Sequence, residues 1–233
     1  MSESNALLEA GEMTAKQLDE IYQLLFERFG RQHWWPGESK FEIIIGAILT
    51  QNTNWANVEK AIANLKSAGC LTPHKLQGLD HRELALLIRP AGYYNIKAKR
   101  LKNFMNWLFD NHAGKLSNLE GVETEQLRTE LLSVKGIGCE TADSILLYAF
   151  ERPVFVVDAY TARIAVRHRL IEPGADYEQL RELFQSNLPE DVRLFNEYHA
   201  LLVRVGKEFC RPQPRCAGCP LEKLPHTVNI EYF

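Results

Sequence analysis

Apolar side chains recur at intervals of three and four residues along most of the chain, the spacing that places them on one face of an α-helix. Between residues 15 and 30, Leu18, Ile21 and Leu25 follow this spacing, and Gly30 is well placed to end the helix. The same pattern predicts further helices over residues 40–50, 54–68, 82–89, 96–111, 125–133, 139–150, 159–169, 177–188 and 191–206. The pattern therefore predicts an all-α fold.

One short segment departs from the helical spacing. Residues 154–157 read Val-Phe-Val-Val, which is typical of a strand, but four residues cannot build a sheet. The chain has no internal repeat, no low-complexity stretch and no long linker. Any division into domains must therefore arise from helices that pack in two clusters.

Length and composition place the chain among ordinary folded proteins. It has 233 residues, of which 45% are hydrophobic and 24% charged, which excludes a disordered, collagen-like or disulfide-rich class. The longest apolar run, residues 43–49, is far shorter than the ~20 residues that cross a bilayer. No basic residue precedes Lys16 and no apolar stretch follows the start, so we expect no signal peptide and a cytoplasmic protein.

The net charge of −3 gives no global indication of nucleic-acid binding. Two local clusters are basic: residues 89–103 hold several Lys and Arg and no acid, and Arg163, Arg167 and Arg169 lie close together. Taken alone, each cluster is either a solvated helix face or a binding surface.

The cysteines are unevenly distributed. Cys70 and Cys139 are isolated, whereas Cys210, Cys216 and Cys219 form a C-x5-C-x2-C cluster. An odd total of five in a chain expected in the cytoplasm argues against disulfides.

Residues 131–143 contain a short helix, a Gly-Ile-Gly turn and a second helix that opens near Thr141. Gly136 and Gly138 let the backbone turn tightly while Ile137 packs beneath it, and backbone N–H groups then face outward. Such a turn suits a phosphate group. The alternative is a plain connection between two helices.

Asp158 lies 20 residues after Gly138 and follows a Pro and a β-branched run, and a helix is expected after it. By itself Asp158 could be a helix N-cap. The turn followed by Pro and Val-Asp, however, resembles the helix-hairpin-helix (HhH-GPD) DNA glycosylase superfamily, which includes endonuclease III. In that family the Asp is catalytic.

Several unlinked segments are similar, more narrowly, to the 3-methyladenine DNA glycosylase III branch, namely residues 33–36, 40–42, 50–53, 89–101 and 135–138. The resemblance implies two helical subdomains of the endonuclease III type. We expect residues 31–145 to form the subdomain with the hairpin. Residues 1–30 and 146–233 would form the other, which ends in the cysteine-rich loop.

The resemblance also implies the function, which is excision of a damaged base from double-stranded DNA. We expect a monomer that does not bind a membrane. Asp158 would stabilise the charged transition state and orient the attacking water. The glycosidic bond of an alkylated purine such as 3-methyladenine breaks with little help from a general acid. Binding the base after it has flipped out of the stack is therefore the harder task. The other expected site residues are Trp34, Trp35, Tyr93, Tyr94 and Glu140 at the base pocket, and Gln51, Lys135, Gly136, Ile137, Gly138 and Thr141 at the DNA.

Of the four aromatic candidates, we expect at least one of Trp34 and Trp35 to be a core residue instead. Bifunctional members of the family carry a Lys two residues after the second hairpin Gly, and this chain has Glu140 there. A carboxylate cannot form the Schiff base, so hydrolysis without strand cleavage is expected. Two alternatives remain, an endonuclease III-like glycosylase and AP lyase for oxidised pyrimidines, and a non-catalytic DNA-binding module.

Endonuclease III-type members hold a 4Fe-4S cluster with four thiolates, and this chain offers three, Cys210, Cys216 and Cys219. His226 follows near the expected fourth position and is the candidate fourth ligand. A zinc ion held by the same four residues, or no metal at all, are the alternatives.

Overall fold

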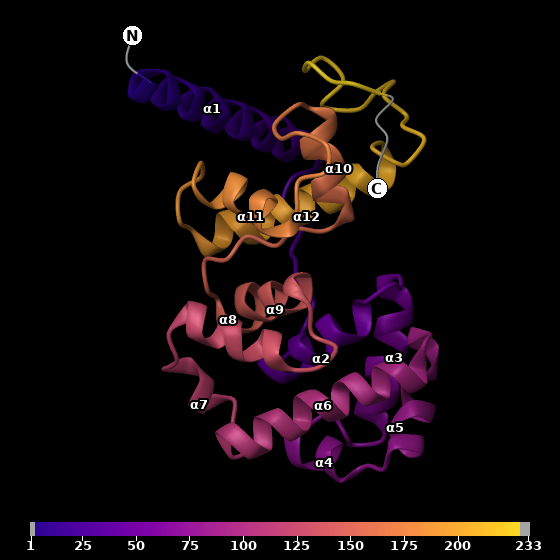
Figure 1. Cartoon of the computed structure of the whole chain (residues 1–233). Helices are drawn as coiled ribbons and strands as arrows, with labels where there is room; N and C mark the ends of the chain where they lie inside the picture. The colour runs from indigo at the N-terminus through magenta and orange to yellow at the C-terminus, as the bar shows by residue number, and fades with distance from the viewer. Residues whose placement is uncertain (1–2, 229–233) are drawn as a thin grey trace. The chain divides into compact units, whose positions relative to one another are not determined.

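The computed structural model describes residues 3–228, and in that part every regular element is helical (Figure 1). This confirms the all-α prediction. The α-helices are α1 (Glu3–Phe29), α2 (Lys40–Thr50), α3 (Trp55–Ser67), α4 (Pro73–Gly78), α5 (His81–Leu87), α6 (Tyr94–His112), α7 (Ser117–Glu120), α8 (Thr124–Ser133), α9 (Cys139–Ser144), α10 (Ala159–Arg167), α11 (Tyr177–Gln185) and α12 (Val192–Glu208), with a 3-10 turn η1 (Arg89–Ala91) and a π-helical turn η2 (Ile145–Ala149). None of the helices in the described part is both long and apolar enough to cross a membrane.

The chain forms two compact units. One comprises Trp35–Arg152, and the other combines Met1–Trp34 with Pro153–Phe233. The sequence predicted subdomain boundaries between residues 30 and 31 and between residues 145 and 146, and these boundaries remain a prediction.

In the Trp35–Arg152 unit, the apolar helix α2 packs against α3, α6 and η2 (Figure 1). Its side chains from Ile44 to Leu49 are almost entirely buried, which explains the unbroken apolar run of the sequence. The 3-10 turn η1 also packs on α3 and lies next to the start of α6. The loops that follow α2 and η1 are thereby fixed to one core.

In the other unit, α12 packs against both α10 and α1. Phe155 stacks on Phe184, with ring centroids 4.2 Å apart and planes 5° apart. The Tyr198 hydroxyl donates a hydrogen bond to the Leu18 carbonyl oxygen (2.8 Å), which joins α12 to α1 inside the core.

The helix ends show which sequence signals were decisive. Helix α2 has the predicted bounds, Asn54 caps α3, and Asp80 forms a capping box with Glu83 at the start of α5. The expected helix over 159–169 ends earlier, at Arg167, because Arg169 adopts a left-handed backbone with φ +58°. The strand-like segment 154–157 is buried and belongs to no sheet.

Three short elements were missing from the sequence interpretation, namely α4, α7 and η1. Helix α1 is also longer than predicted, since it begins at Glu3 instead of near Ala15.

Candidate functional site

The Gly-Ile-Gly turn joins α8 to α9 and depends on one of its two glycines. Gly136 has φ +103°, and a Cβ atom there would lie 2.4 Å from Cγ of Arg100. Gly138 has an extended backbone with φ −101° and ψ −179°, and a Cβ there would meet nothing within 4 Å. The expectation that both glycines are needed for the turn is therefore wrong, because any residue adopts the backbone of Gly138.

Two buried features brace this hairpin. Ile137 is buried beneath the turn, as expected. Nε of Arg128 in α8 lies 2.7 Å from Oδ1 of Asp143 in α9, and Nη2 lies 3.2 Å from Oδ2. Both side chains are buried, so the two helices of the hairpin are joined by a bidentate ion pair away from water.

Gln51 is bound to the hairpin by its side chain. Its Nε2 donates to the Gly136 carbonyl oxygen (3.0 Å) and to Oγ1 of Thr141 (2.8 Å). Nη1 of Arg100 donates to Oε1 of Gln51. The structure thus brings together three residues that the sequence predicted at the DNA, although 85 and 90 positions separate Gln51 from the other two. Lys135 is exposed beside them.

Lys97 was counted with the first basic cluster of the sequence, as part of a solvated face or a binding surface, and for this residue both interpretations are wrong because it is buried. Its ammonium group is buried and donates to the carbonyl oxygens of Leu49 and Ala91, at 2.8 Å each. Burial, and secondarily the charge of Arg100, lower the pKa of Lys97 to about 8. A signal existed in the sequence, because Lys97 lies on the same helical face as the apolar Leu101 and Phe104.

The four aromatic candidates for the base pocket have different surroundings. Trp35 contacts the ring of Trp55 edge-on, with centroids 4.9 Å apart, and the ring of Tyr148 at 5.0 Å. Trp35 belongs to the Trp35–Arg152 unit, whereas Trp34 ends the first segment of the other unit. Tyr93 is 68% exposed and has a left-handed backbone with φ +44°. The sequence interpretation did not include Trp55 or Tyr148 among the aromatic candidates.

The remaining two pocket candidates lie near the start of helices. Tyr94 is half-buried and begins α6, and Glu140 is exposed in the first turn of α9. Their assignment to a base pocket, and that of Trp34, Trp35 and Tyr93, stays a prediction.

Asp158 is the N-cap of α10. Its Oδ1 accepts hydrogen bonds from the backbone N–H of Thr161 (2.8 Å) and from Oγ1 of the same residue (3.0 Å). Its Oδ2 lies 3.7 Å from Nε2 of His199 in α12. The capping alternative raised by the sequence is therefore correct as a description of local structure, and it leaves a charged oxygen directed away from the helix.

The carboxyl group of Asp158 is kept ionised. Burial raises its pKa, but His199 and the two donors of Thr161 outweigh that effect and hold the pKa below its usual value. His199 was missed in the sequence, where it is one polar residue within the apolar stripe of a predicted helix.

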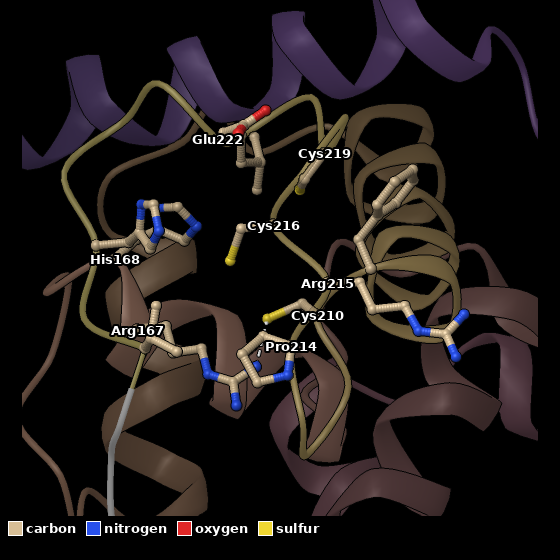
Figure 2. A pocket seen from close by; sticks show the side chains of 12 residues that line it. Arg167, His168, Cys210, Pro214, Arg215, Cys216, Cys219 and Glu222 are labelled. Atoms are coloured by element: carbon tan, nitrogen blue, oxygen red, sulfur yellow. Dashed lines mark hydrogen bonds between the residues drawn. The ribbon is translucent and has the colours of Figure 1, made fainter.

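The three clustered cysteines line one cavity of about 30 Å³, together with His168 and His226 (Figure 2). Burial raises the pKa of the Cys219 thiol to about 11. Burial also lowers the pKa of His168 to about 4, assisted by His226. All five cysteines lie within the described residues. As the sequence predicted, no disulfide joins any of them.

Arg167 fixes the loop that carries these cysteines. Its Nη1 donates to Sγ of Cys210 (3.2 Å) and to the Arg211 carbonyl oxygen (2.7 Å), and its Nη2 donates to the Pro212 carbonyl oxygen (2.8 Å). The adjacent Arg163 donates to the Cys210 carbonyl oxygen (2.7 Å). Part of the second basic cluster of the sequence is therefore neither a solvated face nor a free binding surface, because two of its members hold this loop.

The donor set distinguishes the metals considered for this loop. Within residues 3–228, no three His, Cys, Asp or Glu side chains are arranged to hold one metal ion. The residues therefore do not fit zinc, whose four ligands must converge on a single ion. In a 4Fe-4S cluster each thiolate binds its own iron, so the ligands surround a volume instead. The three thiols here line one cavity.

Comparison with known proteins decides the family. The model of the HhH-GPD superfamily of base excision DNA repair proteins matches residues 45–190, more than half of the chain. The chain belongs to the HhH-GPD superfamily. Within it, the chain is an endonuclease III-like DNA repair glycosylase.

Two curated members of the HhH-GPD superfamily are similar over most of their length. A Methanocaldococcus jannaschii protein named "Putative DNA repair glycosylase MJ1434" is 48% identical over 88% of this chain and 93% of its own. Endonuclease III of Thermotoga maritima is 30% identical over 88% of this chain and 90% of its own.

Two solved structures share the fold. H. pylori 3-methyladenine DNA glycosylase bound to 1,N6-ethenoadenine has a TM-score of 0.70 and 30% identity, over 84% of this chain and 97% of that protein. A non-covalent endonuclease III–DNA complex has a TM-score of 0.78 at 23% identity, over 91% of this chain and 94% of that one.

Proposed function

We propose that this protein hydrolyses the N-glycosidic bond of alkylated purines such as 3-methyladenine in double-stranded DNA and leaves the strand intact. The observation that carries the proposal is Asp158, a carboxylate that is 12% exposed and kept ionised at the start of α10. Similarity to the H. pylori 3-methyladenine glycosylase, and the segments shared with that branch, support the choice of substrate class.

The chemistry suits a lone carboxylate. An alkylated purine carries delocalised positive charge, so its glycosidic bond breaks without a strong general acid. As it breaks, positive charge develops on the sugar, and an ionised Asp158 stabilises that charge in a site of low polarity. The same carboxylate orients the attacking water and accepts its proton.

Binding requires that the damaged nucleotide leave the base stack, at a cost of a few kcal/mol. In this proposal Gln51 fills the position that the nucleotide leaves. The backbone of Gly136, Ile137, Gly138 and the N-terminal turn at Thr141 holds a phosphate, and Lys135 adds positive charge. The contact at Ile137 is through its backbone alone, because its side chain is buried.

An aromatic face gains about 0.5–2 kcal/mol from a cationic base by cation–π attraction. Trp34, Trp35, Tyr93 and Tyr94 remain the proposed sources, and Glu140 is proposed as a further residue of the base pocket. Of these, Trp35 is half-buried, and its ring contacts two other aromatic rings.

A Schiff-base nucleophile is absent from the family position, which Glu140 occupies. The proposed reaction is therefore monofunctional, with water as the nucleophile and no β-elimination.

For the cysteine loop, we propose a 4Fe-4S cluster bound by Cys210, Cys216, Cys219 and His226. Nδ1 of His226 lies 2.8 Å from the Leu224 carbonyl oxygen, which accepts only, so this nitrogen carries the proton and Nε2 keeps a lone pair for a metal. Such a cluster would order the loop. Anaerobically purified protein should then contain iron and sulfide and absorb broadly in the visible range, and His226→Ala should speed its loss in air. Colourless anaerobic protein without iron would refute the cluster.

The function is tested with duplexes that each carry one defined lesion, by assaying release of the free base separately from strand cleavage. We expect base release from the alkylated purines without cleavage. Asp158→Asn should retain the fold and duplex binding while slowing base release at least about 100-fold.

Borohydride reduction of the same mixtures should trap no covalent protein–DNA adduct. Efficient trapping, or release of oxidised pyrimidines with strand cleavage, would instead support the endonuclease III-like alternative. Duplex binding with no base released from any lesion would support the non-catalytic module.

A further inference from the structure

His199 is a buried imidazole within the apolar face of α12. Its side chain is 6% exposed, and its neighbours Tyr198, Leu201 and Leu202 are buried too. Helix α12 packs against α10, whose N-cap is Asp158. A polar ring in such a core needs a partner, and this ring faces the carboxylate.

The two oxygens of Asp158 have different surroundings. Oδ1 accepts both hydrogen bonds from Thr161, so it is fixed by the first turn of α10. Oδ2 faces Nε2 of His199 at 3.7 Å, which is within ion-pair range and longer than a hydrogen bond. Contacts of catalytic groups are often long in the free enzyme and shorten when substrate binds.

The charged groups on the elements next to His199 are directed elsewhere. On α10, Arg163 and Arg167 donate to the carbonyl oxygens of the cysteine loop. On α1, the Tyr22 ring contacts Tyr198, and the charge of Asp19 helps to raise the pKa of Tyr198.

The remaining neighbours contribute little charge at the carboxylate. On α12 itself, Glu197 accepts from the backbone of Gln32 (2.6 Å). The Tyr177 hydroxyl of α11 is the acceptor for the Val157 backbone N–H (3.4 Å). Within residues 3–228, His199 is therefore the one ionisable group in ion-pair range of Asp158.

We propose that His199 is a positioning residue for base release: its Nε2–H holds Oδ2 of Asp158 and keeps the carboxylate aimed and charged during the reaction. This inference rests on the proposed function of Asp158. Thr161 alone fixes one oxygen and leaves the carboxyl group free to rotate about it. A second donor on the opposite side removes that freedom.

The role has a signature in the pH dependence. His199 helps to hold the pKa of Asp158 below its usual value. Base release needs the ionised carboxylate, so activity is lost as the pH falls through that pKa. Without His199 the pKa of Asp158 rises, and the acid limb of the pH–rate profile moves to higher pH.

The test uses a matched pair of substitutions, His199→Gln and His199→Met. Both side chains are unbranched and favour helices, but only Gln presents an N–H at a similar reach. The rate constant of base release is measured at saturating enzyme on a duplex with one alkylated purine, across the acid pH range. We expect His199→Met to slow release about 10-fold or more, with unchanged duplex affinity and an acid limb at higher pH. His199→Gln should recover most of the rate at neutral pH.

Tyr198→Phe is the control for packing of the same helix, since its hydroxyl bonds α1 and does not touch Asp158. It should lower stability and leave the rate unchanged. Equal losses in the Gln and Met variants, or wild-type rate and acid limb in His199→Met, would overturn the proposal. A wrong assignment of Asp158 would give a different result from a wrong assignment of His199, because Asp158→Asn would then keep full activity.

Discussion

The hairpin around Gly136 and the carboxylate of Asp158 are held in place by different means. Gln51 and Arg100 reach the hairpin from two other segments of the chain. The buried pair of Arg128 with Asp143 joins the hairpin's own two helices. Asp158 is held by the first turn of its own helix and faces a single imidazole.

The difference matches what each region must supply. In the proposed function the hairpin binds a phosphate through its backbone, so its shape must be fixed, and we expect the buried ion pair to contribute to this. In the proposed function Asp158 stabilises a positive charge through its electrostatic field, which the full positive charge of an adjacent Arg would largely cancel. We therefore expect substitutions at the hairpin to act on stability and binding, and substitutions near Asp158 to act on rate.

The largest effect on stability should come from Arg128→Ala, which leaves the fully buried carboxylate of Asp143 without its cation. We expect the free energy of unfolding to fall by about 3–5 kcal/mol, measured by denaturant titration. The surface pair of Lys40 and Glu120 is the control, with both side chains about half exposed. Lys40→Ala should change stability by less than about 1 kcal/mol. Equal effects of the two variants would contradict the assignment of a shape-fixing role to the buried pair.

Next in size is a pH effect at Lys97. Its pKa is about 8 in the fold and lies near the ordinary 10.5 in the unfolded chain. Between these values the unfolded state binds more protons, so stability rises with pH by up to about 3 kcal/mol. Lys97→Met should abolish this rise, when unfolding is measured from pH 7 to pH 10.5. The exposed Lys99→Met should keep it, and a rise that persists in Lys97→Met would assign it to another group.

A smaller effect separates the two hairpin glycines. Gly136→Ala would force a side chain into a left-handed backbone and against Arg100, at a cost of about 1–3 kcal/mol. It should also weaken duplex binding, which a fluorescence titration measures. Gly138→Ala meets no atom and no backbone strain, so its stability should stay within about 0.5 kcal/mol of wild type. Equal losses in both variants would show that the turn is not fixed by Gly136.

The smallest effect is expected at Thr161→Val, which removes the hydroxyl donor to Asp158 but keeps the backbone donor. Loss of one hydrogen bond should cost about 1 kcal/mol of stability. Base release should slow only a few-fold, because Oδ1 remains capped. A loss as large as that of Asp158→Asn would mean that Thr161, and not His199, holds the carboxylate in its active orientation.

The sequence predicted most of the fold because the helices are long, periodic and capped by local residues. Asn54 and Asp80 mark helix starts through bonds to residues three positions away, which a sequence shows directly. Helices α4 and α7 were missed because six and four residues are too few to display a helical period.

The site was predicted in part, as single residues without their partners. The local motif predicted both the hairpin and Asp158. The contact of Gln51 with Gly136, and that of His199 with Asp158, join segments far apart in the chain, and one sequence holds no signal for such pairs. Periodicity could have indicated Lys97 and His199, since a charged or polar residue on an apolar helical face has to find a buried partner.

The ammonium group of Lys97 also sets which parts of the molecule open together. It binds the carbonyl oxygen of Leu49, two residues before Gln51, and that of Ala91, two residues before Tyr93. If either loop detaches from the core, its hydrogen bond to Nζ of Lys97 breaks. The buried ammonium group is then left with a missing partner. The two loops therefore belong to one cooperative unit of local unfolding, and their amide hydrogens should exchange with solvent at matching rates.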